Sequence, residues 1–307
     1  MTAVAPGTAV AVSVPATSGN LGAGFDCVGL ALDLRDDYEA RVVGEPGFEV
    51  ESTGVGAAEL PRDGSHLVAQ SMRAGLERIG LEIPGVKIIC RNRIPHSRGL
   101  GSSAAAIVGG AALAYALADI RSPEAVSQQN AEVLQLAAEV EGHSDNAAPA
   151  VLGGLTVSWW SENTGRTEAI SSTVADSISV VIFLPEAISP TKAARAALPD
   201  EIPLADAVHN CARSALLIPA LSGRPELLFD ATADRLHQES RRHGYPAAMT
   251  LVDDLRSRGV AAAISGAGPG VIAFCIGEQV DELNRLSVPG YQVREVGVGH
   301  GLSRSRI

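Results

Sequence analysis

Glycines and hydroxyl side chains occur together in one short segment, from Pro95 to Ala105, which reads PHSRGLGSSAA. Glycine lets a backbone approach an anion closely, and the N–H groups in the first turn of a following helix favour a phosphate. The hydroxyls of Ser102 and Ser103 could bind a phosphate oxygen or a metal ion. A glycine turn followed by a serine N-cap explains the same residues about as well, so the segment alone leaves both interpretations open.

Two common nucleotide-binding patterns fit this chain poorly. A P-loop places Lys between Gly and Ser or Thr, and neither of the two lysines, Lys87 and Lys192, has such neighbours. The segment 99–104 does fit the relaxed dinucleotide pattern GxGxxA. However, the expected strand ends several residues before Gly99, and Asp119, the acid at a suitable spacing, lies at the end of an expected helix. A dinucleotide site is therefore the weaker alternative.

Asn20 and Asp26 lie in a second glycine-rich segment, Pro15–Asp26, which follows an expected strand. An amide and a carboxylate in such a loop could hold a small polar ligand, although an Asx-type turn accounts for them equally well. A third glycine-rich run, Ser265–Gly270, joins two expected strands. By itself this run favours a tight hairpin over a contact with a ligand.

Carboxylates and a histidine gather near the end of an expected helix, at Glu139, Glu141, His143 and Asp145. Carboxylate oxygens suit Mg²⁺, and Asp145 or His143 could move a proton. The competing explanation is polarity at a helix end, with Asp145 capping the next short helix. The other histidines lack metal-ligand spacing, and the four cysteines lack the CxxC spacing of a zinc site.

The composition indicates a folded, acidic protein. The chain has 307 residues, of which 46% are apolar and 19% charged, and this excludes an extended disordered chain. With a net charge of −11 and no basic run, neither nucleic acid nor an anionic membrane is expected as a partner. The N-terminus lacks a signal-peptide pattern and the longest apolar run is too short to cross a bilayer, so we expect a soluble cytoplasmic protein.

Periodicity and turn residues predict an α+β protein with helices packed on mostly antiparallel sheets. We expect strands at 9–14, 38–43, 48–51, 86–90, 155–160, 179–184, 260–264, 271–276 and 291–296. We expect helices at 65–79, from 102 onward, and at 123–141, 191–198, 203–221, 246–258 and 278–286. Ser65 is the expected cap of the first helix. The polar stretch 161–177 predicts a domain boundary near residue 160, which divides the chain into domains 1–160 and 161–307.

Taken together, these segments resemble the motifs of the GHMP small-molecule kinases and, within that superfamily, the homoserine kinase family. Pro95–Ala105 is similar to the superfamily's phosphate loop, Pro15–Asp26 to the opening loop of the homoserine kinases, and Glu141–Pro149 to their second motif. Similarity at Thr191–Arg195, Leu236–Arg241 and Ser265–Gly270 extends the resemblance over essentially the whole chain.

The resemblance implies the two-domain GHMP kinase fold, with an N-terminal nucleotide-binding α+β domain and a C-terminal ferredoxin-like α+β domain. It implies transfer of the γ-phosphoryl group of ATP, with Mg²⁺, to the side-chain hydroxyl of L-homoserine, a step of threonine biosynthesis. Whether the protein forms a homodimer is left open. A non-catalytic relative that binds the metabolite without turnover is a further alternative, although the joint presence of Ser103, Glu139 and Asp145 argues against it.

By resemblance, one segment would bind the nucleotide phosphates, and two side chains would hold the metal ion. The phosphate-binding residues would be Pro95, His96, Ser97, Arg98, Gly99, Leu100, Gly101, Ser102, Ser103, Ala104 and Ala105. Ser103 and Glu139 would hold Mg²⁺.

The resemblance also implies how the amino-acid substrate is held. Asn20 would contact the acceptor hydroxyl, and Asp26 the substrate ammonium. His143, Arg195 and Arg241 would surround the amino-acid end. Asp145 lies where mevalonate-type relatives have a catalytic aspartate, and whether it acts as a base is left open.

Overall fold

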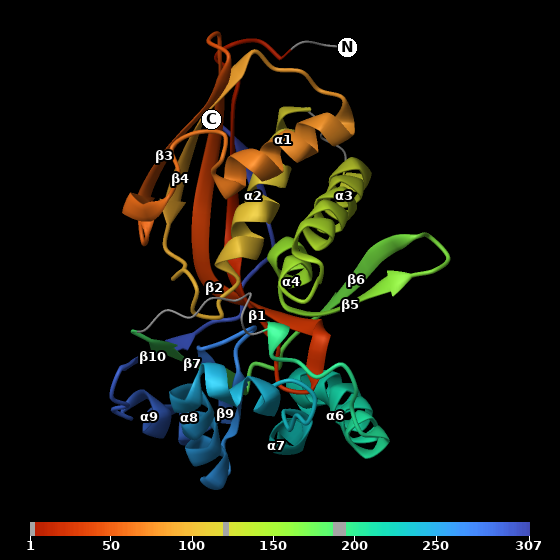
Figure 1. Ribbon diagram of the computed structural model, residues 1–307, viewed down its shortest axis with the longest axis vertical. Coiled ribbons are helices and arrows are strands. Elements are labelled where there is room, and N and C mark those ends of the chain that lie inside the picture. The colour runs from red at the N-terminus through yellow and green to blue at the C-terminus, as the bar shows by residue number, and fades with distance from the viewer. Residues whose placement is uncertain (1–3, 119–122, 187–194) are drawn as a thin grey trace.

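The chain folds into two lobes, shown one above the other in Figure 1. The computed structural model describes residues 4–118, 123–186 and 195–307. The strands are β1 (Ala9–Asn20), β2 (Gly24–Val43), β3 (Gly47–Gly54), β4 (Gly85–Asn92), β5 (Leu155–Ser161), β6 (Arg166–Ser172), β7 (Ile178–Pro185), β8 (Ala261–Ile264), β9 (Val271–Ile276), β10 (Tyr291–Val296) and β11 (Ser303–Arg306).

Helices pack against the sheet of each lobe, as the sequence predicts. The α-helices are α1 (Leu67–Ile79), α2 (Ser102–Leu117), α3 (Pro123–Glu141), α4 (Ala147–Leu152), α6 (Leu204–Gly223), α7 (Leu228–Ala231), α8 (Pro246–Ser257) and α9 (Gln279–Asn284). The short 3-10 helices are η1 (Ala57–Glu59), η2 (Pro225–Leu227) and η3 (Glu239–Gly244). Residues 191–194 of the predicted helix 191–198 lie outside the described residues. Among the described residues, no helix combines the length and apolarity that crossing a bilayer would require.

The upper lobe is a seven-stranded sheet in the order β11-β1-β2-β4-β3, with β5 pairing with β2 and β6 with β5. The expected loop Pro15–Asp26 is mostly strand, because β1 and β2 pair almost continuously until a turn at residues 21–23. Small residues let other segments pack directly on this strand pair. A side chain at Gly29 would overlap the backbone carbonyl of Asp145, so glycine is required for this approach.

Helix α2 lies at the centre of the upper lobe and is buried on nearly every side. It packs against β1, α1 and α3, and its small side chains allow these close contacts. Its N-terminal end points toward the junction of the two lobes (Figure 1). The N-cap of helix α1 is His66 rather than the predicted Ser65, because the imidazole of His66 accepts the Val68 N–H.

The lower lobe contains a four-stranded antiparallel sheet in the order β10-β7-β9-β8. Helix α8 lies between β7 and β8 along the chain, and α9 lies between β9 and β10. This β-α-β-β-α-β arrangement is the ferredoxin-like one, which confirms that expectation. Helices α6 and α7 and the helix η3 are inserted ahead of α8.

The chain does not pass from the upper sheet to the lower sheet at residue 160. That residue lies inside β5, and β6 pairs with β5 along its whole length, so both strands belong to the upper sheet. The polar sequence of β6 concealed this strand, which has one neighbour and a partly exposed surface. The second sheet starts at Ile178, while β11 returns from the C-terminus to pair with β1. A division of the domains at residue 160 stays a prediction.

Candidate active site

A cavity of about 320 Å³ opens where the two lobes meet. Its walls come from the β1–β2 turn, the glycine-rich loop before α2, the residues after α3, and the β8–β9 hairpin. Arg195 and Arg241 reach it from the second half of the chain. The three glycine-rich segments and the acidic segment singled out in the sequence therefore all contribute to one cavity.

The start of α2 forms one end of this cavity. Gly101 is the N-cap, with a left-handed φ of 64° that few residues other than glycine adopt. The first-turn N–H groups of a helix have no partner within the helix and carry its positive dipole end. Ser102 and Ser103 therefore lie where an anion would be stabilised, as the phosphate-loop prediction requires.

The phosphate loop is held by both lobes. Thr17 in β1 donates its backbone N–H to Leu100 O at 3.1 Å. From the lower lobe, the hydroxyl of Ser265 donates to Gly99 O. Arg98 does not face the cavity, because its guanidinium donates to Pro185 O at 2.6 Å and to Glu186 O at 2.9 Å. The Ser265–Gly270 run is thus a hairpin, as predicted, and it also supports the loop.

A hydroxyl and a carboxylate pair beside the helix start. Ser103 Oγ donates to Glu141 Oε1 at 2.6 Å. Burial raises the pKa of Glu141, against the lowering effect of the Ser103 hydrogen bond. In the described part of the chain, the second oxygen, Glu141 Oε2, is buried and has no hydrogen-bond partner. Such an unpaired buried carboxylate oxygen is suited to a cation.

Glu139 is not placed where the sequence motifs implied. Its carboxylate accepts from Arg78 at 3.0 and 3.1 Å and from Gln135 at 2.7 Å, outside the cavity. The hydrogen bonds from Arg78 lower the pKa of Glu139. Two residues along an α-helix turn about 200°, so Glu139 and Glu141 face opposite sides. The structure therefore corrects the predicted partner of Ser103 from Glu139 to Glu141.

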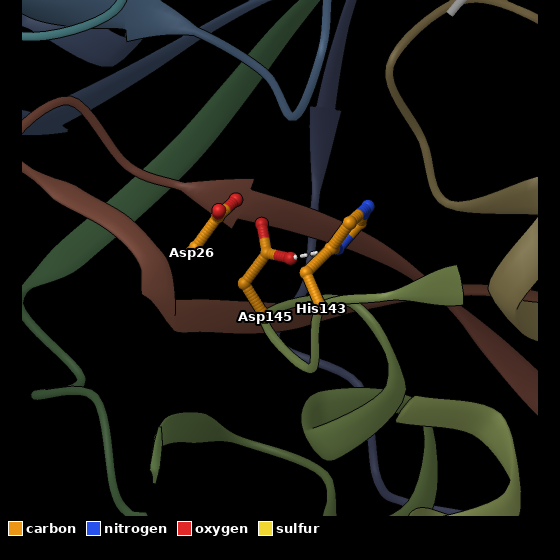
Figure 2. Close-up of side chains that lie close together, drawn as sticks. All are labelled: Asp26, His143 and Asp145. Carbon is orange, nitrogen blue, oxygen red and sulfur yellow. Dashed lines mark hydrogen bonds and ion pairs between the residues drawn. The ribbon is translucent and has the colours of Figure 1, made fainter. Parts of the chain in front are cut away.

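His143 and Asp145 form a hydrogen-bonded pair in the middle of the cavity. The His143 Nδ1 lies 2.6 Å from Asp145 Oδ1, and Figure 2 shows Asp145 between His143 and Asp26. Asp145 is 98% buried at its side chain, and its other oxygen accepts from Asn146 Nδ2 at 3.3 Å. Burial lowers the pKa of His143, but the hydrogen bond and charge of Asp145 outweigh it, so the net shift is upward.

Opposite charges face each other at the far end of the cavity. Arg195 Nη2 donates to Asp26 Oδ1 at 2.7 Å. Arg241 is 3% exposed and lies over the ring of Phe25, with its guanidinium carbon 5.5 Å from the ring centroid. Burial lowers the pKa of Arg241. The structure therefore brings Asp26, the predicted partner of the substrate ammonium, together with Arg195 and Arg241, which were both expected at the amino-acid end.

Asn20 lies between these two ends and joins the lobes. Its amide nitrogen donates to Gly266 O at 2.8 Å, and its amide oxygen accepts from the Asp26 N–H at 3.0 Å. Both Asn20 and Asp26 have positive φ angles, of 72° and 58°. The amide thus fixes the turn that presents the Asp26 carboxylate, in addition to lining the cavity.

A second cavity, of about 220 Å³, adjoins the first on the other side of the phosphate loop. The two cavities share Leu67, Ser102 and Ser103. Apolar and ring-bearing side chains line the second one, including Tyr38, Leu60, Val68, His66 and His96. The phosphate-loop motif contributes His96, Ser102 and Ser103 to this cavity. No motif identified the rest of its lining, because those residues are scattered over several strands and helices.

Three ligand-type side chains lie close enough to be considered as a cation site. One ligand atom each from Asp26, His143 and Asp145 falls within 4.8 Å of the others. Arg195 already pairs with Asp26, and His143 pairs with Asp145. These contacts explain the cluster without a metal ion, so Ser103 and Glu141 remain the better pair of ligands.

Comparison with known proteins defines the class of the protein. Residues 66–154, which hold the phosphate loop and the end of α3, match the family model for the N-terminal domain of GHMP kinases. The solved structure of homoserine kinase from Cytophaga hutchinsonii has the same fold, with a TM-score of 0.80 over 98% of each chain at 24% identity. The two-domain GHMP kinase fold expected from the motifs is thus confirmed.

Whole-chain similarity then defines the family. The chain is 45% identical to homoserine kinase from Streptomyces avermitilis over 290 residues, which cover 94% of this chain and 93% of the relative. It is 43% identical to homoserine kinase from Cutibacterium acnes over 295 residues, which cover 95% and 98%. The chain belongs to the homoserine kinase family, as its sequence motifs indicated.

Proposed function

We propose that this protein transfers the γ-phosphoryl group of ATP to the side-chain hydroxyl of L-homoserine. The observation that supports this most is the polarity of one cavity. A helix N-terminus with Ser103 and Glu141 lies at one end, and Asp26, Arg195 and Arg241 lie at the other. The first end suits phosphates and a metal ion, while the second suits a zwitterion.

The donor set near Ser103 fits Mg²⁺. Mg²⁺ prefers oxygen ligands and is usually held by one or two protein groups together with substrate phosphates. The Ser103 hydroxyl and the unpaired Glu141 Oε2 supply such oxygens. Bound there, the ion would neutralise charge on the transferring phosphoryl group.

An amino-acid zwitterion fits between Asp26 and the two arginines. Asp26 and Arg195 already pair with each other. Inserting the substrate ammonium against Asp26 and its carboxylate against Arg195 and Arg241 keeps every charge paired, which matters because an unpaired charge in a desolvated site is costly. Arginine can also meet a carboxylate with two parallel hydrogen bonds.

The acceptor hydroxyl would then lie near Asn20 and Asp145. Phosphoryl transfer depends mainly on positioning and charge neutralisation. His143 and Asn146 fix both oxygens of Asp145, so the carboxylate can orient the hydroxyl and receive its proton. Against the effect of burial, the hydrogen bond and charge of Asp145 raise the pKa of His143, so this pair favours a protonated imidazole.

The second cavity is the proposed nucleoside site. It opens from the phosphate loop and shares Ser102 and Ser103 with the first cavity, so a nucleotide could occupy both. Its mixture of aliphatic side chains, Tyr38 and two histidines suits a planar base with polar edges.

Measuring ATP turnover with a panel of acceptors tests this function. With Mg²⁺ and ATP, L-homoserine should react far faster than L-serine, mevalonate or galactose. L-Serine has the same charged ends but lacks one methylene, so its hydroxyl would not reach the phosphate end. Comparable turnover on mevalonate would assign the chain to another branch of the superfamily, and no turnover with any acceptor would indicate a binding protein.

A further inference from the structure

A buried histidine lies behind the zwitterion end of the cavity and does not line it. His237 lies in the chain segment that joins α7 to η3, and its side chain is completely buried. Its ring stacks on Phe25, with the ring centroids 5.0 Å apart and the planes inclined by 21°. Arg241 lies over the same phenyl ring. His237 therefore packs directly behind the residues that the proposed function gives to the substrate's charged ends.

The partners of His237 define its protonation state. Nε2 lies 2.8 Å from Gly22 O, in the turn between β1 and β2, and a carbonyl oxygen can only accept. Nδ1 lies 2.9 Å from Arg241 Nη1, and a guanidinium can only donate. These contacts assign a neutral imidazole with its hydrogen on Nε2. Burial, the largest effect, lowers the pKa of His237 and supports the neutral form.

The segment that carries His237 is itself rigidly held. Asp234 accepts the backbone N–H groups of Leu236, His237 and Gln238 at 2.9 to 3.1 Å, and the side-chain amide of Asn210 at 2.8 Å. Its Oδ1 lies 3.7 Å from His237 Nε2. The imidazole therefore has a fixed position from which it can orient other groups.

We infer that His237 is a positioning residue for the amino-acid substrate, a conclusion that rests on the proposed function. Its Nδ1 orients the guanidinium of Arg241 toward the carboxylate. Its Nε2–H holds Gly22, and so the turn that leads to Asp26. Of these two contacts, the one to Arg241 is the one that affects homoserine binding, because Asn20 separately fixes the turn that presents Asp26.

Two substitutions of His237 each remove one of its two hydrogen bonds and keep the other. His237→Gln places an amide nitrogen near the position of Nε2, so the bond to Gly22 O is kept and the acceptor for Arg241 is lost. His237→Asn places an amide oxygen near the position of Nδ1 and does the reverse. His243 is exposed on the neighbouring η3, and His243→Gln is the matched control.

Steady-state kinetics with homoserine and ATP provide the test. His237→Gln should raise KM for homoserine about tenfold, the effect of losing one hydrogen bond to a charged group, while KM for ATP changes less than about twofold. His237→Asn should restore most of the homoserine KM. His243→Gln should match the wild-type enzyme. In an Arg241→Leu background, His237→Gln should add nothing, because both changes remove one contact.

The contrary results are distinct. A purely structural role would lower the melting temperature and raise both KM values together, without rescue by His237→Asn, and this would overturn the inference. If His237→Gln does not fold, a tenfold rise in homoserine KM for a folded His237→Asn enzyme would also overturn it. Lack of homoserine turnover in the wild-type enzyme would instead refute the proposed function, and this inference with it.

Discussion

Glu139 and Glu141 show how two nearby carboxylates of one helix take different roles. Glu139 pairs with Arg78 on α1, where its side chain is half exposed. Glu141 pairs with Ser103 beside the start of α2. Ion pairs with this much exposure contribute little to stability. Of the two carboxylates, only Glu141 therefore remains as a candidate metal ligand, together with the Ser103 hydroxyl.

Removing each carboxylate in turn checks this assignment. Glu141→Ala should lower kcat by about a hundredfold, the scale of losing one electrostatic contact to the transition state, and should raise the Mg²⁺ concentration needed for half-maximal rate. Glu139→Ala is the matched control and should change kcat less than about twofold. Equal losses in the two variants would contradict the geometry.

The raised pKa of Glu141 predicts a stability change that needs no substrate. Burial makes the ionised carboxylate unfavourable in the folded protein, so its folded pKa exceeds its unfolded pKa. The charge therefore destabilises the fold above the folded pKa, and this cost disappears as the pH falls below the unfolded value. Without Mg²⁺, Glu141→Gln should raise the melting temperature at pH 7 and lose that advantage near pH 4. A lower melting temperature at pH 7 would refute the account.

Arg241 tests how the substrate carboxylate is bound. Arg241→Leu should raise KM for homoserine roughly tenfold to a hundredfold, since a hydrogen bond to a charged group contributes about 1.5–3 kcal/mol. The KM for ATP should change little, because the phosphate loop lies at the other end of the cavity. An unchanged homoserine KM with impaired ATP binding would remove Arg241 from the substrate site.

At the residue scale, sequence motifs identified most of the candidate site. Asn20, Asp26, Asp145, Arg195 and Arg241 all reach the cavity, as their motifs predicted, and their roles remain proposals. Glu141 could have been found from helix periodicity. It lies four and eight residues after Ala137 and Val133, which are buried, so it belongs to the inward face of α3.

At the scale of elements, the β8–β9 hairpin is a support for the phosphate loop. Ser265→Ala removes the hydroxyl that binds Gly99 O and Ser18 Oγ. Losing the hydrogen bond to Gly99 O, worth about 1 kcal/mol, should raise KM for ATP about fivefold and leave KM for homoserine unchanged. Ser257→Ala is the control, because this serine of α8 is exposed and does not line the cavity. A larger effect on homoserine than on ATP would contradict this role.

Local patterns predicted most elements, and they failed where pairing over long distances decides the structure. The segment Pro15–Asp26 looked like a loop because glycines and polar residues dominate it, yet β1 and β2 pair through most of it. Strand β6 is polar because it has few buried positions. The contact of Ser265 with Gly99 spans 166 residues, and no local signal encodes it.

At the scale of the molecule, the two lobes divide recognition between them. The upper lobe supplies the N-terminus of α2, Glu141 and Asp145, while the second half of the chain supplies Arg195 and Arg241. The substrate must therefore match the cavity at both ends. Binding therefore depends on both the shape and the charges of the substrate.

The measurement that tests this account most directly is kcat/KM for homoserine and three trimmed analogues. L-Serine shortens the chain, 4-hydroxybutyrate lacks the ammonium, and 3-amino-1-propanol lacks the carboxylate. The account predicts that homoserine exceeds each analogue by at least about tenfold, because each analogue leaves one buried group unpaired or misplaces the hydroxyl. Equal kcat/KM for homoserine and either analogue that lacks a charged end would contradict it.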